Sequence, residues 1–239
     1  MIVLKTVNIK NSILNCCVMV LVCGIDEAGR GPIIGPMVMC GVLTDEEGAG
    51  KLKKVGAKDS KLLSPKERER LFKEIVKIVK NYKIVIISPA EIDASVQSTD
   101  GMNLNWLEAH KSAEIVNFLK PDKIIIDSPS NNIDNYRKYL VKLLNNKKID
   151  AVVEHKADVN HVECSAASIL AKVTRDAEVE KIKKVVVEDF GSGYLSDPRT
   201  VAFFDRYFEV YPDIFRKSWA PYKDKVSGKS QKRLGDFND

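Results

Sequence analysis

The sequence predicts an α/β fold with one mixed sheet, followed by a smaller helical part. Short apolar segments rich in Val and Ile come first and then alternate with segments of helical periodicity, which is typical of a sheet flanked by helices. After Phe190 the composition changes to Gly- and Pro-containing breaks, followed by aromatic-rich helical sequence up to Trp219. A chain of 239 residues, 44% hydrophobic and 30% charged, can bury a proper core.

The N-terminal end is the least specified part of the chain. Lys5 and Lys10 before an apolar stretch faintly resemble a signal peptide, but Asn15 interrupts that stretch, which is too short to span a bilayer. We therefore expect this stretch to contain the first core strand, and Met19 is an alternative start of the protein. The expected parts are an extension at 1–17, an α/β domain at 18–187 and a helical subdomain with a basic tail at 188–239.

The strands are expected where β-branched residues dominate short apolar segments. The first two segments are separated only by a rigid Gly/Pro connection at 31–36, which favours neighbouring antiparallel strands. The later segments alternate with helical sequence, so the sheet is expected to be mixed. The expected strands are 18–25, 38–43, 82–87, 123–127 and 151–154.

The helices are expected where apolar residues recur with amphipathic spacing. The first has Ser64 as its N-cap, Pro65 at the first helical position and Glu67 at the third. Pro121 ends the second, and small residues at the start of the last predict close packing. The expected helices begin at 65 with an apolar face up to 79, and then span 103–119, 133–144 and 165–184.

The cations of the chain cluster, although the net charge is only +5. Twelve basic residues stand against four acidic ones between Lys51 and Lys83, and seven against one between Phe215 and Arg233. This pattern suits a polyanion held over a metal centre, or, as an equally good alternative, lysines that simply cover helix faces. The five cysteines are odd in number and form no C-x-x-C motif, which indicates buried thiols in a reducing compartment.

Asp26 and Glu27 directly follow the first apolar run and precede Gly29, Arg30 and Gly31. Adjacent carboxylates repel each other unless cations or protons intervene, and their oxygens suit Mg²⁺ or Mn²⁺. The Gly-Arg-Gly sequence offers close backbone approach and a cationic fork for phosphate. The alternative is a turn followed by a solvated arginine.

Further acids follow two later strands. Asp127 follows one apolar run, and Glu154 ends another that leads on to Asp158. In open α/β sheets functional residues gather at strand ends, although each acid alone could be a turn former or a helix cap. Together they indicate a carboxylate cluster.

Several motifs together resemble those of type 2 ribonucleases H, in their archaeal-like form. They occur in the order of that family and cover residues 18 to about 205 of the chain. The matching segments are Asp26–Gly31, Asp59–Lys61, Asp127–Pro129, Lys156–Asp158 followed by Ser165–Lys172, and Gly193–Thr200.

This resemblance implies a ribonuclease H-like fold, with a mixed five-stranded sheet, flanking helices and a C-terminal helical module. It implies endonucleolytic cleavage of RNA in RNA–DNA hybrids and at single ribonucleotides embedded in duplex DNA, leaving 5′-phosphate and 3′-hydroxyl ends. Asp26, Glu27, Asp127 and Asp158 would be the catalytic acids and the ligands of two divalent ions.

The resemblance also implies how ribose is recognised. The 2′-hydroxyl distinguishes RNA from DNA, and in the family a Gly-Arg-Gly backbone and a tyrosine recognise it. These map to Gly29, Arg30, Gly31 and Tyr194. The phosphate contacts are expected from Lys61 and Lys172, and Arg199 is a weaker candidate.

The tail supports a second hypothesis about partners. Gln231, Leu234 and Phe237 have a Q-x-x-L-x-x-F spacing that resembles the motif by which replication proteins bind sliding clamps. Asn238 stands where a second aromatic residue is usual, which predicts weak binding, and chance spacing in a polar tail is the alternative.

The sequence therefore indicates a cytoplasmic, monomeric, Mg²⁺- or Mn²⁺-dependent type 2 ribonuclease H that acts in DNA replication and repair. One rival is another nuclease or resolvase of the same fold, acting on branched or single-stranded DNA. A second rival is a catalytically silent nucleic-acid-binding module.

Overall fold

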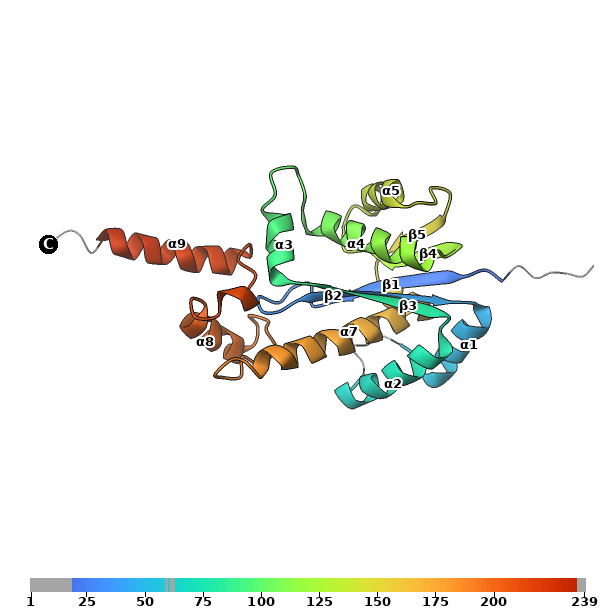
Figure 1. Cartoon of the computed structure of the whole chain (residues 1–239), viewed down its shortest axis with the longest axis horizontal. Helices are drawn as coiled ribbons and strands as arrows, with labels where there is room; N and C mark the ends of the chain where they lie inside the picture. The colour runs from blue at the N-terminus through green and yellow to red at the C-terminus, as the bar shows by residue number, and fades with distance from the viewer. Residues whose placement is uncertain (1–18, 59, 61–62, 236–239) are drawn as a thin grey trace, which may run out of the picture.

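A mixed sheet lies at the centre of the molecule in the computed structural model, which describes residues 19–58, 60 and 63–235 (Figure 1). In this part of the chain the sheet has five strands in the order β3-β2-β1-β4-β5. β1, β2 and β3 pair antiparallel, whereas β4 and β5 run parallel to β1, which confirms the expected mixed sheet. The strands are β1 (Val22–Ala28), β2 (Met37–Thr44), β3 (Asn81–Ile87), β4 (Lys123–Asp127) and β5 (Asp150–Glu154).

Helices cover both faces of the sheet (Figure 1). Side chains alternate along β2, so Met37 and Met39 pack under α4 and α5 while Val38 and Cys40 pack against α1, α2 and α7. Each face therefore has its own buried apolar core. The helices of these layers are α1 (Glu46–Val55), α2 (Pro65–Ile78), α4 (Leu104–Leu119), α5 (Ile133–Leu143) and α7 (Val162–Lys183).

The long helix α7 lies directly against β1. A Cβ atom on Gly24 would lie only 2.3 Å from the backbone carbon of Glu163, so only glycine in the strand allows this approach. The close packing expected from the small residues of this helix is confirmed, because Ala166 and Ala167 are fully buried. The segment just before α7, residues 157–160, lies against the end of β4.

The first strand differs from the expected one. β1 continues through Asp26 and Glu27 to Ala28, because all three residues still pair with β2. The parallel pairing with β4, in contrast, ends at Ile25. The two acids therefore lie inside the strand, beside the point where its parallel neighbour stops, and not after it.

The capping signal at Ser64 correctly marks one helix start, and Asn103, which was expected to begin a helix, is the N-cap of another. The Glu67 N–H donates to Ser64 Oγ at the start of α2, and the Trp106 N–H donates to Asn103 Oδ1 at the start of α4. Three shorter helices were not predicted, because each contains few repeats of the apolar spacing. These are α1, α3 (Pro89–Val96) and α6 (Ala157–Asn160).

The chain after α7 is helical, as expected. It forms α8 (Pro198–Tyr207), a 3₁₀ turn η2 (Pro212–Ile214) and α9 (Ala220–Gly235), which extends away from the sheet (Figure 1). A buried aromatic cluster joins this part to Ile33, Ile34 and Val179; its members are Phe190, Phe203, Phe204, Phe208 and Phe215. We expected the last dozen residues to be loose, but α9 occupies them as far as Gly235. The boundary at residue 188 stays a prediction.

Two further features bear on function. Cys23, Cys40 and Cys164 are buried free thiols, as expected, whereas Cys16 and Cys17 lie outside the described residues. Among the helices of the described part, none is long and apolar enough to cross a membrane.

Candidate active site

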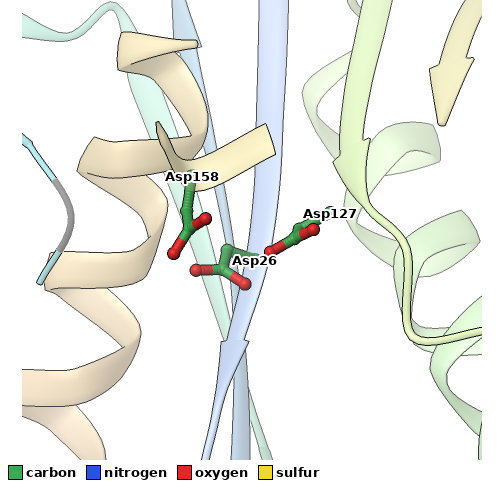
Figure 2. Close-up of side chains that lie close together, drawn as sticks. All are labelled: Asp26, Asp127 and Asp158. Carbon is green, nitrogen blue, oxygen red and sulfur yellow. The ribbon is translucent and has the colours of Figure 1, made fainter. Parts of the chain in front are cut away.

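Three carboxylates from different segments meet beside the end of β4. Asp26 belongs to β1, Asp127 is the last residue of β4, and Asp158 belongs to α6. One oxygen atom from each lies within 4.8 Å of the others, and the side chains point toward one another (Figure 2). Asp26 and Asp158 are buried and Asp127 is half-buried. The predicted cluster of acids is therefore present for these three residues.

The backbone explains why these acids meet. β1 and β4 are parallel neighbours whose pairing ends at Ile25 and Ile126, so the next residue of each strand is an aspartate at the same edge. After β5 the chain turns sharply through Lys156, whose φ is +62°, and begins α6. The Ala157 N–H then donates to Asp127 Oδ1 at 3.4 Å, which ties α6 to the end of β4.

The electrostatics of the cluster favour a bound cation. Burial, together with smaller contributions from the neighbouring Asp127 and Asp158, raises the pKa of Asp26 to about 7, against the lowering effect of the Ser168 hydroxyl and the Glu27 N–H. Adjacent buried carboxylates are costly to ionise together unless a positive charge joins them. Carboxylate oxygens are hard ligands of the kind that Mg²⁺ and Mn²⁺ prefer, so the donor set fits such an ion.

Glu27 does not belong to this group of three. Glu27 follows Asp26 in β1 and lines the same cavity, but its carboxylate is not among the three that cluster. Burial, and then the negative charge of Glu108, raise the pKa of Glu27 well above its usual range, while Arg30 lowers it. Its predicted role as a metal ligand stays a prediction.

A cavity of about 290 Å³ joins the acids to the segment between β1 and β2. It holds most of the residues that the sequence analysis singled out for catalysis and substrate binding. Lys61 lies outside the described residues, but Ser60 beside it lines the cavity. The lining residues are Asp26, Glu27, Ala28, Gly29, Arg30, Gly31, Ser60, Arg68, Asp127, Ser168, Lys172 and Tyr194.

We call residues 29–36 the β1–β2 loop. Gly29 has a φ of +79°, and a Cβ atom there would lie 2.8 Å from Arg175 Nε, so both conformation and space require glycine. At Gly31 a Cβ atom would lie 3.5 Å from the ring of Tyr194, which shows how close the tyrosine is to the loop. Tyr194 is 37% exposed and stacks over the guanidinium of Arg175 at 5.7 Å.

The Arg30 side chain departs from its expected role as a phosphate fork. Its Nε donates to Glu108 Oε1 and its Nη2 to Asn105 Oδ1, both at 2.8 Å. Glu108 is fully buried in α4, and burial raises its pKa to about 7 although Arg30 lowers it. The guanidinium therefore ties the β1–β2 loop to α4.

The two remaining candidate cations differ in position. Lys172 lines the cavity and donates to Asp176 at 2.7 Å from one turn earlier on α7. Arg199 pairs with Asp189 and Asp197 at the start of α8 and does not line the cavity. These contacts favour Lys172 over Arg199 as a substrate contact.

The sequence analysis missed four residues that hold the site together. Glu108 could have been noticed, because it is an acid on the apolar face of a predicted helix. Arg175 and Arg216 are buried arginines that contact the β1–β2 loop, and Ser168 contacts Asp26. Ser168 lies in the matching segment Ser165–Lys172, whereas no sequence signal distinguishes Arg175 and Arg216 from ordinary basic residues.

Comparison with known proteins identifies the family. Residues 23–222 match the family model for ribonuclease HII. Ribonuclease HII of Pyrococcus furiosus is 46% identical over 201 residues, which cover 82% of this chain and 87% of that protein. The ribonuclease HII of Methanococcus maripaludis is 43% identical over 211 residues, covering 85% and 86%.

Solved structures agree with this assignment. The crystal structure of ribonuclease H2 from Pyrococcus horikoshii superimposes with a TM-score of 0.77 at 39% identity, covering 86% of this chain and 96% of that one. Ribonuclease HII in its complex with PCNA from Archaeoglobus fulgidus gives 0.71 at 38% identity, covering 79% and 87%. The expected ribonuclease H-like fold is thereby confirmed.

Sequence, fold and site thus agree with one another. The chain belongs to the ribonuclease HII family and is a ribonuclease H endonuclease, of the kind that cleaves the RNA of RNA–DNA hybrids.

Proposed function

We propose that this enzyme also cuts duplex DNA at single embedded ribonucleotides, by a two-metal-ion hydrolysis that leaves 5′-phosphate and 3′-hydroxyl ends. The observation that carries the proposal is that Asp26 and Asp127 of the carboxylate cluster line the same cavity as a glycine-rich loop and a tyrosine. The acids supply the chemistry of phosphodiester cleavage. The loop and the tyrosine supply recognition of a single ribose.

The ligands of the ions would be Asp26, Glu27, Asp127 and Asp158. Bound Mg²⁺ or Mn²⁺ ions would activate the attacking water and stabilise the leaving 3′-oxygen. The protein orients the Asp26 carboxylate in advance, since the Glu27 N–H donates to Asp26 Oδ1 at 2.8 Å, and it fixes the backbone that carries Asp158, since Ser165 Oγ donates to the Asp158 carbonyl at 2.6 Å. Such preorganisation avoids reordering during the reaction.

Ribose recognition would use the backbone of Gly29, Arg30 and Gly31 together with Tyr194. A 2′-hydroxyl both donates and accepts hydrogen bonds, so backbone groups in close contact can distinguish ribose from deoxyribose. The exposed ring of Tyr194 can stack on a sugar or base. Lys61 and Lys172 would contact phosphates of the substrate.

The test is cleavage of a duplex with one ribonucleotide beside an identical all-DNA duplex, with Mg²⁺ or Mn²⁺ supplied. We expect cleavage at the ribonucleotide alone. Equal cleavage of both duplexes would favour a nuclease or resolvase of broader specificity. Binding without cleavage would favour a silent nucleic-acid-binding module.

We also propose a sliding clamp as a partner, bound through Gln231, Leu234 and Phe237. The structural relative from Archaeoglobus fulgidus was solved as a complex with PCNA, which supports this proposal. Gln231 and Leu234 are one turn apart on α9, whereas Phe237 lies outside the described residues. Removal of residues 230–239 should abolish binding to the clamp in a pull-down and leave cleavage of short duplexes unchanged; equal clamp binding would remove the idea.

The proposal includes a monomeric, cytoplasmic enzyme acting in DNA replication and repair. The buried free thiols of Cys23, Cys40 and Cys164 suit a reducing compartment. Sedimentation of the full chain at micromolar concentration tests the monomer, and a dimer in that experiment would correct it.

A further inference from the structure

We propose that Arg216 is a positioning residue for ribose recognition, because it fixes the β1–β2 loop from the side opposite the cavity. This inference rests on the proposed function of that loop. Arg216 lies after η2, in the C-terminal part of the chain, and does not line the cavity. Its role would be to make the loop present its N–H groups to the substrate.

The contacts of Arg216 are concentrated on this loop. Nη2 donates to the Gly29 carbonyl at 2.5 Å, Nη1 to the Arg30 carbonyl at 2.6 Å, and Nε to the Gly35 carbonyl at 3.1 Å. The fixed fork of a guanidinium can serve several carbonyls at once, which a lysine ammonium cannot do with the same geometry. One side chain therefore constrains both ends of the loop.

Trp219 completes the arrangement. Its Nε1–H donates to the Gly31 carbonyl at 3.3 Å, and its ring lies 5.0 Å from the guanidinium of Arg216. The carbonyls of all three residues of the Gly-Arg-Gly sequence thus accept hydrogen bonds from the same C-terminal segment.

Because peptide bonds are planar, the hydrogen bonds to these carbonyls also fix the direction of the N–H groups that follow them. In a trans peptide the N–H points opposite to the C=O of the preceding residue, and the described residues include no cis peptide bond. Because the carbonyls of Gly29 and Arg30 point to Arg216, the N–H groups of Arg30 and Gly31 point away from it. Both residues line the cavity, so that is the direction in which a ribose would lie.

Arg216 is itself firmly held. It is fully buried, and its own N–H donates to the Ile33 carbonyl at 2.9 Å. The next two residues are fixed by Asp93 of α3, whose carboxylate accepts from the N–H groups of Lys217 and Ser218 at 2.8 Å. Burial lowers the pKa of Arg216 to about 9, which still leaves it charged at neutral pH. Burying a guanidinium whose hydrogen bonds go to neutral carbonyls costs free energy. A role in holding the loop accounts for its presence.

The test compares Arg216→Lys with Phe208→Leu. Phe208 lies in the aromatic cluster, where its ring contacts Phe204 and Tyr222, so its substitution weakens packing in the C-terminal part without removing any hydrogen bond from Arg216 to the loop. Two quantities are measured below the unfolding temperature of each variant. One is hydrogen exchange at the Ile33 and Gly35 amides, which are bonded to the carbonyls of Gly193 and Ile214. The other is the ratio of dissociation constants for all-DNA and ribonucleotide-containing duplexes in EDTA.

We expect Arg216→Lys to speed exchange at these amides and to lower the ribose preference, each by roughly tenfold or more, since it loses charge-assisted hydrogen bonds. Phe208→Leu should change neither the exchange rate nor the ribose preference by more than about twofold. Unchanged exchange and preference in Arg216→Lys, or equal changes in Phe208→Leu, would overturn the inference. If Arg216→Lys does not fold, Trp219→Phe is the second variant; it removes the bond to the Gly31 carbonyl and keeps an aromatic side chain at this position. It should show a smaller effect in the same direction, and no effect there would also overturn the inference.

The two readouts separate this inference from the proposed function. A wild-type protein without ribose preference would refute the proposed recognition. Exchange at the loop amides would still decide whether Arg216 holds the loop.

Discussion

The carboxylate cluster and the β1–β2 loop lie in one cavity but are held in different ways. The cluster is built on regular structure, because β1, β4 and α6 place Asp26, Asp127 and Asp158 by their backbone hydrogen bonds. The loop is held by side chains from distant parts of the sequence; the Arg216–Gly29 bond spans 187 residues. In the proposed function, catalysis would therefore depend on the sheet, and ribose recognition on the C-terminal segment that holds the loop.

The largest expected effect comes from the cluster. Asp127→Asn should lower the cleavage rate by about a thousandfold or more, because metal coordination contributes several kcal/mol to the transition state. Affinity for the duplex should change little. Single-turnover cleavage and fluorescence anisotropy measure the two quantities. Asp134→Asn, at an exposed acid of α5, is the matched control and should keep full activity; retained activity in Asp127→Asn would reject the metal assignment.

Tyr194 should affect selection more than binding. Tyr194→Ala is expected to lower the preference for single ribonucleotides by about tenfold to a hundredfold, the scale of one stacking contact. Tyr194→Phe keeps the ring and loses only the hydroxyl, so comparing kcat/KM of the two variants separates stacking from hydrogen bonding. A loss of general duplex affinity without loss of preference would move Tyr194 out of ribose recognition.

Lys172 is expected to affect the affinity for the duplex and not the preference for ribose. Lys172→Ala should weaken binding of ribonucleotide-containing and all-DNA duplexes equally, and lower the slope of log K against log salt by about 1. Lys181→Ala is the matched control, because Lys181 lies on the same helix, is exposed and pairs with Glu178. Titrations at several salt concentrations measure the slope, and a change in ribose preference would count against a phosphate contact.

The buried acids should make the metal-free protein less stable as the pH rises. Burial raises the pKa of Asp26 and Glu108 to about 7 and raises that of Glu27 as well. Between about pH 5 and pH 8 the folded state therefore binds more protons than the unfolded state, so the free energy of unfolding should fall, by a few kcal/mol at most. Urea denaturation in EDTA measures this fall.

Two controls accompany the pH measurement. Asp26→Asn should flatten the dependence, because it removes one of the raised carboxyl groups. Mg²⁺ should restore stability at the upper end of the range, since it binds the ionised form. A free energy of unfolding that rises with pH in EDTA would show that ionisation of the buried acids does not destabilise the folded protein.

The same contrast explains what the sequence could predict. Asp26, Asp127 and Asp158 interrupt or follow apolar strands, where packing requires no acid, so each is visible as a departure from a pattern. The capped helix at Ser64 and the five strands were visible for similar reasons. The predicted end of the first strand was wrong, because only the pairing with β2 shows that the strand continues through Glu27.

The supports of the loop left no comparable pattern. Arg216 is one of many basic residues in a basic C-terminal stretch, and its burial follows only from the packing of that stretch on α3 and the loop. Arg30 was expected to bind phosphate, but its guanidinium donates a hydrogen bond to the buried Glu108, 78 residues away in the sequence. Contacts between distant segments decide these roles, and one sequence does not contain them.

The proposed function separates cleavage by the acids from ribose selection by the β1–β2 loop. This separation is tested most directly by the ribose preference in binding, measured in EDTA for Asp127→Asn and Arg216→Lys side by side. We predict that Asp127→Asn, which cannot cut, keeps the wild-type ratio of dissociation constants between all-DNA and ribonucleotide-containing duplexes, and that Arg216→Lys loses most of it. Loss of the preference in Asp127→Asn, or its full retention in Arg216→Lys, would contradict the account.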